Sequence, residues 1–232
     1  MQQPPPGTIL KLYDHLLRFV FFQGLSRGEL LQLAGNTKFL FSKVQRGQVV
    51  TREGDACREL LLLINGTVEL STRSMDGGYT LTEQLSAPWT LQPEALFGLH
   101  PRYSSTCRTL DDCQFITLHK DEVLRLADDF FIIRLNLLNI LSTQAQKSRQ
   151  QQWRTAPASL AERLVRFVAA RSAYPAGRKE LKILMRRLAA ELGCSRLEVS
   201  DMLNALQRDG LLQLRRAHIL IPSMERLIQS IH

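Results

Sequence analysis

The stretch from Leu188 to Gln207 constrains the fold of this chain more than any other, because it predicts two helices joined by a tight turn. Leu188, Ala189 and Leu192 have the spacing of one apolar helix face. Gly193 follows them at a position where a helix commonly ends with a positive φ, which is cheap only for glycine. The sequence therefore predicts that the first helix ends at this glycine.

The second helix of this stretch has its own start signal. Ser195 is the predicted N-cap, and Glu198 three residues later completes a capping box. Its expected buried stripe consists of Val199, Met202, Leu203 and Leu206. Two short helices joined by a glycine turn form a helix-turn-helix, in which the second helix lies in the major groove of DNA. A helical hairpin inside an ordinary core is the alternative interpretation, and the rest of the chain decides between them.

The charge of the chain is unevenly distributed. The 232 residues carry a net charge of +8. From residue 147 to the end there are sixteen Lys and Arg against seven Asp and Glu, whereas residues 1–146 have fourteen against fifteen. A neutral first part and a basic second part are typical of a regulatory domain joined to a domain that binds a polyanion.

Composition and the N-terminal sequence predict where the protein works. The hydrophobic fraction of 44% is that of a globular protein, and no apolar run is long enough for a membrane span. The first residues, MQQPPPG, lack the basic region and apolar core of a signal peptide. We therefore expect a cytoplasmic protein that does not enter a membrane and whose four cysteines are reduced.

Before residue 128 the pattern predicts helices followed by many short strands. Helices are expected at Ile9–Phe21 and Ser26–Leu33. The expected strands are Lys38–Phe41, Gln48–Thr51, Leu60–Ile64, Thr67–Ser71, Tyr79–Leu85 and Gln114–Leu118. Glycine turns separate them, and Asn65-Gly66 between two apolar runs predicts a hairpin. Many short strands at this spacing indicate a β-barrel or sandwich.

The segments RGQVVTREGD (46–55) and LLLLINGTVEL (60–70), together with GCSRLEVSDMLNAL (193–206), resemble the CRP/FNR family of bacterial transcription regulators. The resemblance implies an α+β fold with an N-terminal cyclic-nucleotide-binding-like β-roll (jelly-roll), a long dimerisation helix and a C-terminal winged helix-turn-helix domain. The domains expected on this basis are a mobile tail (1–8), a β-roll effector or sensor domain (9–127), a dimerisation helix with its hinge (128–156) and a winged helix-turn-helix DNA-binding domain (157–232).

The long helix is expected to begin at a cap formed by Asp128-Asp129 and to run to about Arg154, roughly 25 residues or ~38 Å. It carries two apolar stripes. One consists of Phe131, Leu135, Leu138, Ser142 and Ala145, and the other of Phe130, Ile133, Leu137 and Ile140. One stripe can face the roll and the other a partner helix, which predicts a homodimer. A helix buried within a monomer explains the apolar half but not the polar extension TQAQKSRQQQ.

The C-terminal part follows the order of a winged helix domain. A break at Ala156-Pro157-Ala158 predicts the hinge. The expected elements after it are a helix at Leu160–Arg171, a short strand at Leu181–Ile183, the helix pair, a wing with strands Leu211–Leu214 and Ile219–Ile221 around the tip Arg215-Arg216-Ala217-His218, and a final helix at Met224–Ile231.

The exposed face of the second helix of the pair is expected to read double-stranded DNA. That face carries Arg196, Leu197, Ser200, Asp201 and Asn204. Arg196 can pair with a guanine, Asp201 can accept from cytosine N4 or orient Arg196, and Leu197 can touch a thymine methyl. Phosphate contacts are expected from Ser195, Arg186, Arg187, Arg215 and Arg216. The best-known family members carry Glu at the position of Leu197 and Arg at the position of Asp201, so a different operator is expected.

The predicted effector pocket departs from the cyclic-AMP-binding members of the family, which carry Gly-Glu and, about ten residues later, Arg-Ser. Here Glu94 follows Pro93, which has no N–H donor, and Tyr103-Ser104 stands for Arg-Ser, with Arg102 one residue away. On the long helix, Gln146-Lys147 stands where those members carry Thr-Ser. Without the arginine opposite the phosphate, cyclic AMP is disfavoured. We expect the pocket to hold another small effector or to be filled by its own side chains. Its predicted residues are Glu94, Arg102, Tyr103, Ser104 and Gln146.

The cysteines and histidines bear on other cofactors and functions. Cys57, Cys107, Cys113 and Cys194 lack metal-ligand spacing, so neither a metal site nor an iron–sulfur cluster is expected. A haem bound through His100, His119 or Cys107 stays an alternative. A cupin-like metalloenzyme would need clustered histidines, and the five here are scattered, so no catalytic residue is expected. The other alternative is a nucleotide-binding module that regulates a partner protein. An activator would also contact RNA polymerase.

Overall fold

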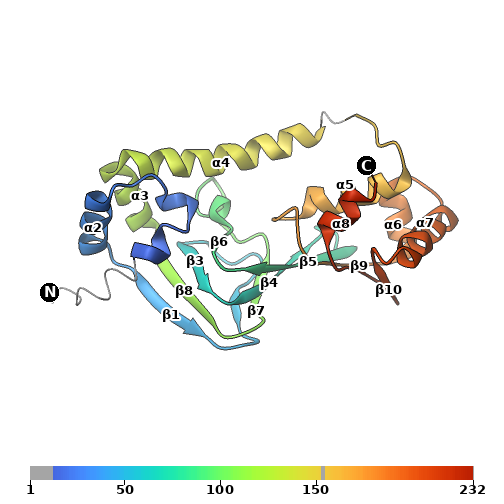
Figure 1. Ribbon diagram of the computed structural model, residues 1–232, viewed down its shortest axis with the longest axis horizontal. Helices are drawn as coiled ribbons and strands as arrows, with labels where there is room; N and C mark the ends of the chain where they lie inside the picture. The colour runs from blue at the N-terminus through green and yellow to red at the C-terminus, as the bar shows by residue number, and fades with distance from the viewer. Residues whose placement is uncertain (1–12, 153–154, 232) are drawn as a thin grey trace. The chain divides into compact units, whose positions relative to one another are not determined.

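The computed structural model describes residues 13–152 and 155–231. The chain forms two compact units (Figure 1). The first unit comprises Met1–Thr67, Ser86–Ser104 and Thr109–Arg149. The second comprises Val68–Leu85, Ser105–Arg108 and Gln150–His232. The predicted domain boundaries at residues 127 and 156 stay a prediction, and the predicted tail at residues 1–8 lies outside the described residues.

The first unit is built on an antiparallel sheet with the strand order β1-β8-β3-β6. These strands are β1 (Leu40–Val44), β8 (Cys113–His119), β3 (Glu59–Asn65) and β6 (Trp89–Leu91), and β2 (Val49–Thr51) lies between β1 and β3 in sequence. In the centre of the sheet Leu60 pairs with Leu118 and Leu62 with Ile116, and all four side chains are buried. The uninterrupted apolar run of β3 fits a strand that is covered on both faces.

Helices accompany this sheet. They are the short 3-10 turns η1 (Val20–Phe22) and η2 (Pro93–Ala95), and the helices α2 (Arg27–Asn36), α3 (Lys120–Asp129) and α4 (Phe131–Gln152). Ser26 caps α2 in a capping box with Glu29. The predicted start of the long helix is wrong: Asp128-Asp129 end α3, Phe130 interrupts the helix, and α4 begins at Phe131. Ser and Asp residues favour helix ends of several kinds, so a carboxylate pair alone could not distinguish an end from a start.

The two stripes predicted for α4 differ in burial. In one stripe Phe130 and Ile133 are buried and Leu137 and Ile140 half-buried, whereas in the other Phe131, Leu135 and Leu138 are exposed by 68%, 38% and 55%. On the buried side, the Asn136 side chain donates to the carbonyl oxygens of Phe21 (3.2 Å) and Gln23 (2.8 Å). The expectation that one stripe faces the first unit is confirmed, and the other stripe is left uncovered in the single chain.

The second unit combines a hairpin from the middle of the chain with the whole C-terminal part. The strands of this unit are neighbours in the order β10-β11-β9-β5-β4-β7. The strands are β4 (Thr67–Arg73), β5 (Tyr79–Ser86), β7 (Thr106–Thr109), β9 (Lys179–Ile183), β10 (Gln213–Arg215) and β11 (His218–Ile221). The helices are α5 (Leu160–Arg171), α6 (Met185–Leu192), α7 (Arg196–Arg208) and α8 (Met224–Gln229).

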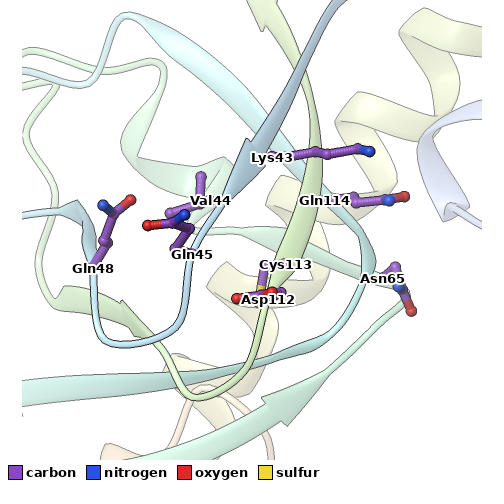
Figure 2. Close-up of a pocket in the computed structure, with 8 residues that line it drawn as sticks. All are labelled: Lys43, Val44, Gln45, Gln48, Asn65, Asp112, Cys113 and Gln114. Atoms are coloured by element: carbon purple, nitrogen blue, oxygen red, sulfur yellow. The ribbon is translucent and has the colours of Figure 1, made fainter.

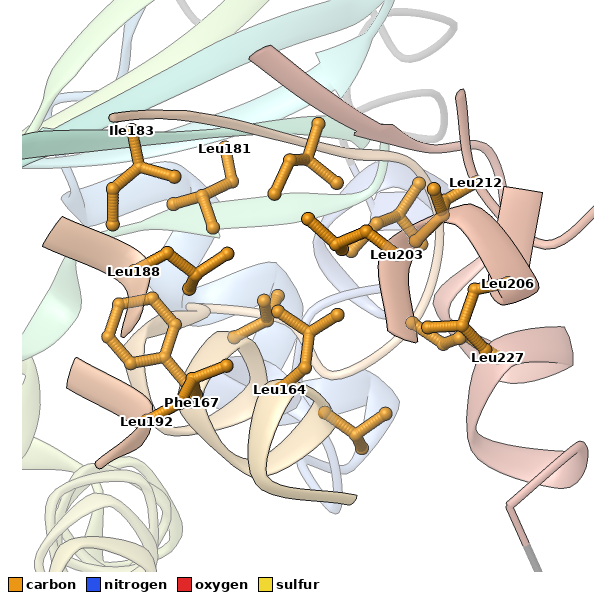
Figure 3. Close-up of a cluster of buried hydrophobic side chains, with 14 of the residues drawn as sticks. Leu164, Phe167, Leu181, Ile183, Leu188, Leu192, Leu203, Leu206, Leu212 and Leu227 are labelled. Carbon is orange, nitrogen blue, oxygen red and sulfur yellow. The ribbon is translucent and has the colours of Figure 1, made fainter. Parts of the chain in front are cut away.

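One hydrophobic core holds these elements together (Figure 3). It combines Leu164 and Phe167 of α5, Leu188 of α6, Leu203 of α7 and Leu181 of β9, all of them buried. Leu81 of β5 belongs to the same core. The apolar faces predicted for the helix pair are therefore the faces that make this core.

The pairing of β5 with β9 was not predicted. Leu81 lies opposite Leu181, and Glu83 lies opposite Lys179. The Glu83 carboxylate and the Lys179 ammonium are 3.1 Å apart, with 1% and 0% of their side chains exposed. Alternating hydrophobicity predicts that a segment is a strand, but it carries no information about which distant strand will be its neighbour.

The hairpin predicted at Asn65-Gly66 is wrong, although the turn exists. β3 and β4 lie in different sheets, and they are not neighbours among the described strands. Gly66 has a φ of 99°, and an added Cβ would come within 2.6 Å of the Asp111 carboxylate and of the Cys113 sulfur. The Asp111 carboxylate also accepts from the Thr67 N–H at 2.7 Å. The residues that contact this turn are more than forty positions away in sequence, so a turn signal alone cannot reveal that β4 leaves the sheet of β3.

Most other predicted elements are confirmed with shifted ends, and α5 has the predicted bounds. The predicted helix at Ile9–Phe21 is helical at residues 13–16 and in η1, and its first residues lie outside the described range. The short strands β6 and β7 and helix α3 were missed. No helix within the described residues has the length and apolar character needed to cross a membrane.

Candidate nucleic-acid interface

The turn between α6 and α7 has the geometry that its sequence predicts. Gly193 adopts the left-handed conformation with a φ of 65°, and its N–H points back to the carbonyl oxygens of Ala189 and Ala190. A residue with a Cβ is strained in this conformation, so glycine is required for the tight turn. The turn brings α7 against α6 through their apolar faces, with Leu188 and Val199 fully buried.

The capping box that starts α7 is confirmed. The Ser195 hydroxyl oxygen accepts from the Glu198 N–H at 3.2 Å, and the Glu198 carboxylate accepts from the Ser195 N–H at 2.8 Å. The backbone and side-chain hydrogen bonds to Ser195 lower the pKa of Glu198. Because the Ser195 oxygen already accepts a hydrogen bond, its O–H is the group with which it can donate to a phosphate.

The face of α7 opposite the core is exposed. Arg196, Leu197, Asp201 and Asn204 are exposed, and Ser200 is half-buried. The Leu197 side chain is 70% exposed. Its apolar surface therefore contributes no burial to the stability of the free protein. The Asn204 amide lies 3.5 Å from the Ser200 hydroxyl one turn earlier. These side chains form a row that starts at the N-terminus of the helix.

The predicted phosphate contacts on α6 differ from each other. Arg186 is exposed. Arg187 is half-buried, and its guanidinium forms ion pairs with Asp76 at 2.8 Å and with Glu191 at 2.7 Å. Hydrogen bonds from Gly78 and Ser74, and the charge of Arg187, lower the pKa of Asp76. Arg187 therefore links α6 to the turn of the β4–β5 hairpin, and its phosphate contact stays a prediction.

The wing is the antiparallel pair β10–β11. Arg215 lies opposite His218, so the turn itself contains Arg216 and Ala217, whose φ is 57°. Arg215 and Arg216 are both exposed. The His218 ring lies 2.8 Å from the Glu180 carboxylate of β9, and the Gln207 side chain of α7 accepts from the Leu214 N–H at 2.7 Å. These bonds hold the wing to the neighbouring strand and to the end of α7.

The predicted effector residues lie in the first unit. Glu94 is exposed in η2, Arg102 and Ser104 are exposed, Tyr103 is buried, and Gln146 is exposed on α4. Sequence reasoning missed two neighbours, Gln92 and Cys57. The side-chain oxygen of Gln92 accepts from both the N–H and the hydroxyl of Ser104, and Cys57 shares a hydrogen bond with Tyr103. No sequence signal pointed to either residue, because each contact depends on a residue far away in the chain.

An open cavity of about 630 Å³ lies elsewhere in the first unit (Figure 2). None of the predicted effector residues lines it. Its lining residues are Lys43, Val44, Gln45, Gln48, Asn65, Asp112, Cys113 and Gln114.

The four cysteines are free thiols. Burial raises the pKa of Cys57, and burial together with the Asp111 carboxylate raises the pKa of Cys113 to about 11. Within the described residues, no three His, Cys, Asp or Glu side chains are grouped so that they could hold a metal ion.

Comparison with known families and structures assigns both parts of the chain. A family model described as "Cyclic nucleotide-binding domain" matches residues 41–130, and one described as "Crp-like helix-turn-helix domain" matches residues 159–230. No curated protein matches the sequence.

Several solved structures resemble the chain at low identity. The sensor domain of the transcriptional regulator DNR from Pseudomonas aeruginosa has a TM-score of 0.52 and 22% identity, covering 66% of this chain and 98% of its own. The catabolite activator protein of Thermus thermophilus has a TM-score of 0.49 and 20% identity over 92% of this chain and 100% of its own. Full-length DNR has a TM-score of 0.47 and 21% identity over the whole of both chains.

Proposed function

We propose that this chain, which belongs to the CRP/FNR family of transcription regulators, binds double-stranded DNA sequence-specifically as a homodimer and reads bases with α7. The family consists of regulators rather than enzymes. The observation that carries the proposal is the exposed N-terminal row of α7, held by a capping box and placed directly after a glycine turn. The N-terminal residues of a recognition helix are the ones that reach base edges.

Each exposed side chain of α7 has chemistry that suits a base edge. The Arg196 guanidinium can donate two parallel hydrogen bonds to guanine O6 and N7. Asp201, five residues further along the helix, can accept from cytosine N4 or orient Arg196. The exposed Leu197 side chain would bury its apolar surface against a thymine methyl, which gives a reason for its 70% exposure in the free protein.

Positive charge around α7 supports phosphate contacts. Arg186 on α6 and Arg215 and Arg216 on the wing are exposed, and the Ser195 O–H lies at the N-terminus of α7, where the helix dipole favours an anion. The excess of basic residues after position 147 extends this charge over the whole C-terminal part. Such contacts fix the position of the protein on the duplex without selecting its sequence.

The dimer would form through the uncovered stripe of α4. Phe131, Leu135 and Leu138 are exposed and follow a 4-3 spacing, as expected for a seam against a second helix. A parallel copy of α4 would bury these side chains and place two copies of α7 on a symmetric site. The protein would act on DNA in the cytoplasm, and as an activator it would also contact RNA polymerase.

Selection of binding sites from random duplex DNA with the purified, ligand-free protein tests this proposal. We expect enrichment of a two-fold symmetric site whose half-sites are about one helical turn apart. The variant Arg196→Ala should lose the preferred base at one position of each half-site. Arg208→Ala removes the same charge from the exposed C-terminal end of α7 and should select the wild-type site. Binding at low salt without any sequence enrichment, in buffer and in cell extract, would contradict the proposal.

A further inference from the structure

The family model that matches residues 41–130 raises the question of whether this β-roll can hold a cyclic nucleotide. The relevant segment runs from Gln92 to Ser104. Gln92 is 6% exposed, and its side-chain oxygen accepts from the Ser104 N–H at 2.8 Å and from the Ser104 hydroxyl at 2.9 Å. A backbone N–H and a serine hydroxyl side by side are the donors that a phosphate oxygen of a ligand would need. Here a side chain of the protein already uses both donors.

The backbone holds Gln92 in this position. Its φ and ψ are 41° and 52°, a left-handed conformation that is unfavourable for a residue with a Cβ. Within the described residues, only Ala217 shares a positive φ without being glycine. Pro93 follows at the start of η2, and the Gln92 carbonyl oxygen accepts from the Ala95 N–H at 2.9 Å. The turn therefore holds Gln92 in a strained conformation in which its side-chain oxygen accepts from Ser104.

The charges of the segment do not suit a phosphate. Arg102 is the one cation among the predicted effector residues, and its guanidinium donates to the Gly54 carbonyl oxygen at 2.7 Å. The buried Tyr103, which stands at the position of the family's arginine, shares a hydrogen bond with Cys57. Glu94 adds a negative charge. A phosphate in this segment would lack the positive partner that normally offsets its desolvation.

We propose that Gln92 is a built-in substitute for a ligand oxygen, so that the β-roll of this chain keeps its effector segment ordered without a cyclic nucleotide. The site that Gln92 fills suits a single uncharged carboxamide oxygen rather than a phosphate. This inference concerns the first unit alone, and its test does not depend on DNA binding.

The first experiment titrates the full-length wild-type protein with cyclic AMP, cyclic GMP and cyclic di-GMP up to roughly millimolar concentration, as suits weak binding. Isothermal titration should show no saturable heat, and the melting temperature should not change. Saturable binding of any of the three nucleotides, accompanied by a rise in melting temperature, would overturn the proposal.

The second experiment compares two variants with equal backbone strain. Both are measured at about pH 4, where a buried carboxyl group is protonated. Gln92→Glu then keeps an uncharged oxygen acceptor for Ser104, whereas Gln92→Leu removes it at similar size. We expect Gln92→Glu to melt near the wild-type temperature and Gln92→Leu to melt about 3 °C lower, because two donors lose their acceptor. Equal melting temperatures for the two variants would show that the acceptor has no role and would overturn the proposal.

The third experiment restores the missing group chemically. Gln92→Gly tolerates the left-handed backbone and leaves a space of carboxamide size, so added acetamide should raise its melting temperature but not that of the wild type. In the double variant Gln92→Gly/Ser104→Ala, which lacks one of the two donors, the rise should be smaller. A rise of equal size in all three proteins would reflect a solvent effect and would contradict a specific acceptor site.

Discussion

At the scale of single residues, the serines of two capping boxes provide a matched test of what α7 does. Ser195→Ala removes the acceptor for the Glu198 N–H, and Ser26→Ala removes the equivalent acceptor for the Glu29 N–H in α2. Each change should lower the free energy of unfolding by about 1 kcal/mol in a urea titration. Only Ser195→Ala should also weaken DNA binding, because its helix carries the face that we propose reads DNA. Equal loss of DNA affinity in the two variants would contradict that role.

A second prediction at this scale concerns thiol reactivity. Burial and the Asp111 carboxylate raise the pKa of Cys113 to about 11. A raised thiol pKa means less thiolate at any pH below that value, so alkylation should be slow at pH 8 and accelerate as the pH approaches 11. Mass spectrometry of iodoacetamide-treated native protein checks this, with urea-unfolded protein as the control. Equal labelling of native and unfolded Cys113 at pH 8 would contradict it.

At the scale of secondary-structure elements, the buried ion pair between β5 and β9 gives a prediction about the free energy of unfolding. Lys179→Met would leave the Glu83 carboxylate buried opposite an apolar side chain and should destabilise the protein by about 3–5 kcal/mol. In Glu83→Gln/Lys179→Met the glutamine oxygen can still accept from the Ala173 N–H, which donates to one Glu83 carboxylate oxygen at 2.7 Å. The longer bond of 3.3 Å from the Tyr174 N–H to the other carboxylate oxygen is lost. The double variant should therefore be more stable than Lys179→Met alone. Additive losses in urea unfolding would show that the pair is not coupled.

The uncovered stripe of α4 gives another prediction at this scale. Leu138→Glu places a charge at the centre of the proposed helix–helix seam, where the wild-type side chain is 55% exposed in the single chain. Sedimentation should show a dimer for the wild type and a monomer for this variant, because a buried carboxylate without a partner disfavours association. Gln144→Glu adds the same charge in the polar extension and should remain dimeric. A monomeric wild type at micromolar concentration would contradict the proposed dimer.

The sequence predicted well those features that depend on interactions between residues close together in the chain. The capping box at Ser195, the glycine turn and the bounds of α5 depend on residues a few positions apart, and each is confirmed. The pairing of β5 with β9 depends on a contact between Glu83 and Lys179, far apart in sequence, so periodicity could not reveal it. Likewise Gln92 gained its role from Ser104, twelve positions away, and its polar side chain alone did not predict a buried acceptor.

At the scale of the whole molecule, charge and fold point to the same conclusion. The first 146 residues are nearly neutral, and the remainder carries the basic excess. The family assignment, the exposed face of α7 and this charge distribution all favour a DNA-binding regulator. In the neutral part, the Gln92 side chain already accepts from the N–H and the hydroxyl of Ser104.

The measurement that tests the central claim most directly is the affinity of the wild type and Arg196→Ala for the selected site and for the same site with one guanine changed, over a range of salt concentrations. The wild type should discriminate between the two sites by about 1–3 kcal/mol, and Arg196→Ala should bind both with equal affinity. Affinity should fall steeply with salt in both proteins, because the phosphate contacts proposed for Arg186, Arg215 and Arg216 are unchanged by the substitution. If Arg196→Ala keeps the full discrimination of the wild type, α7 does not read DNA as proposed.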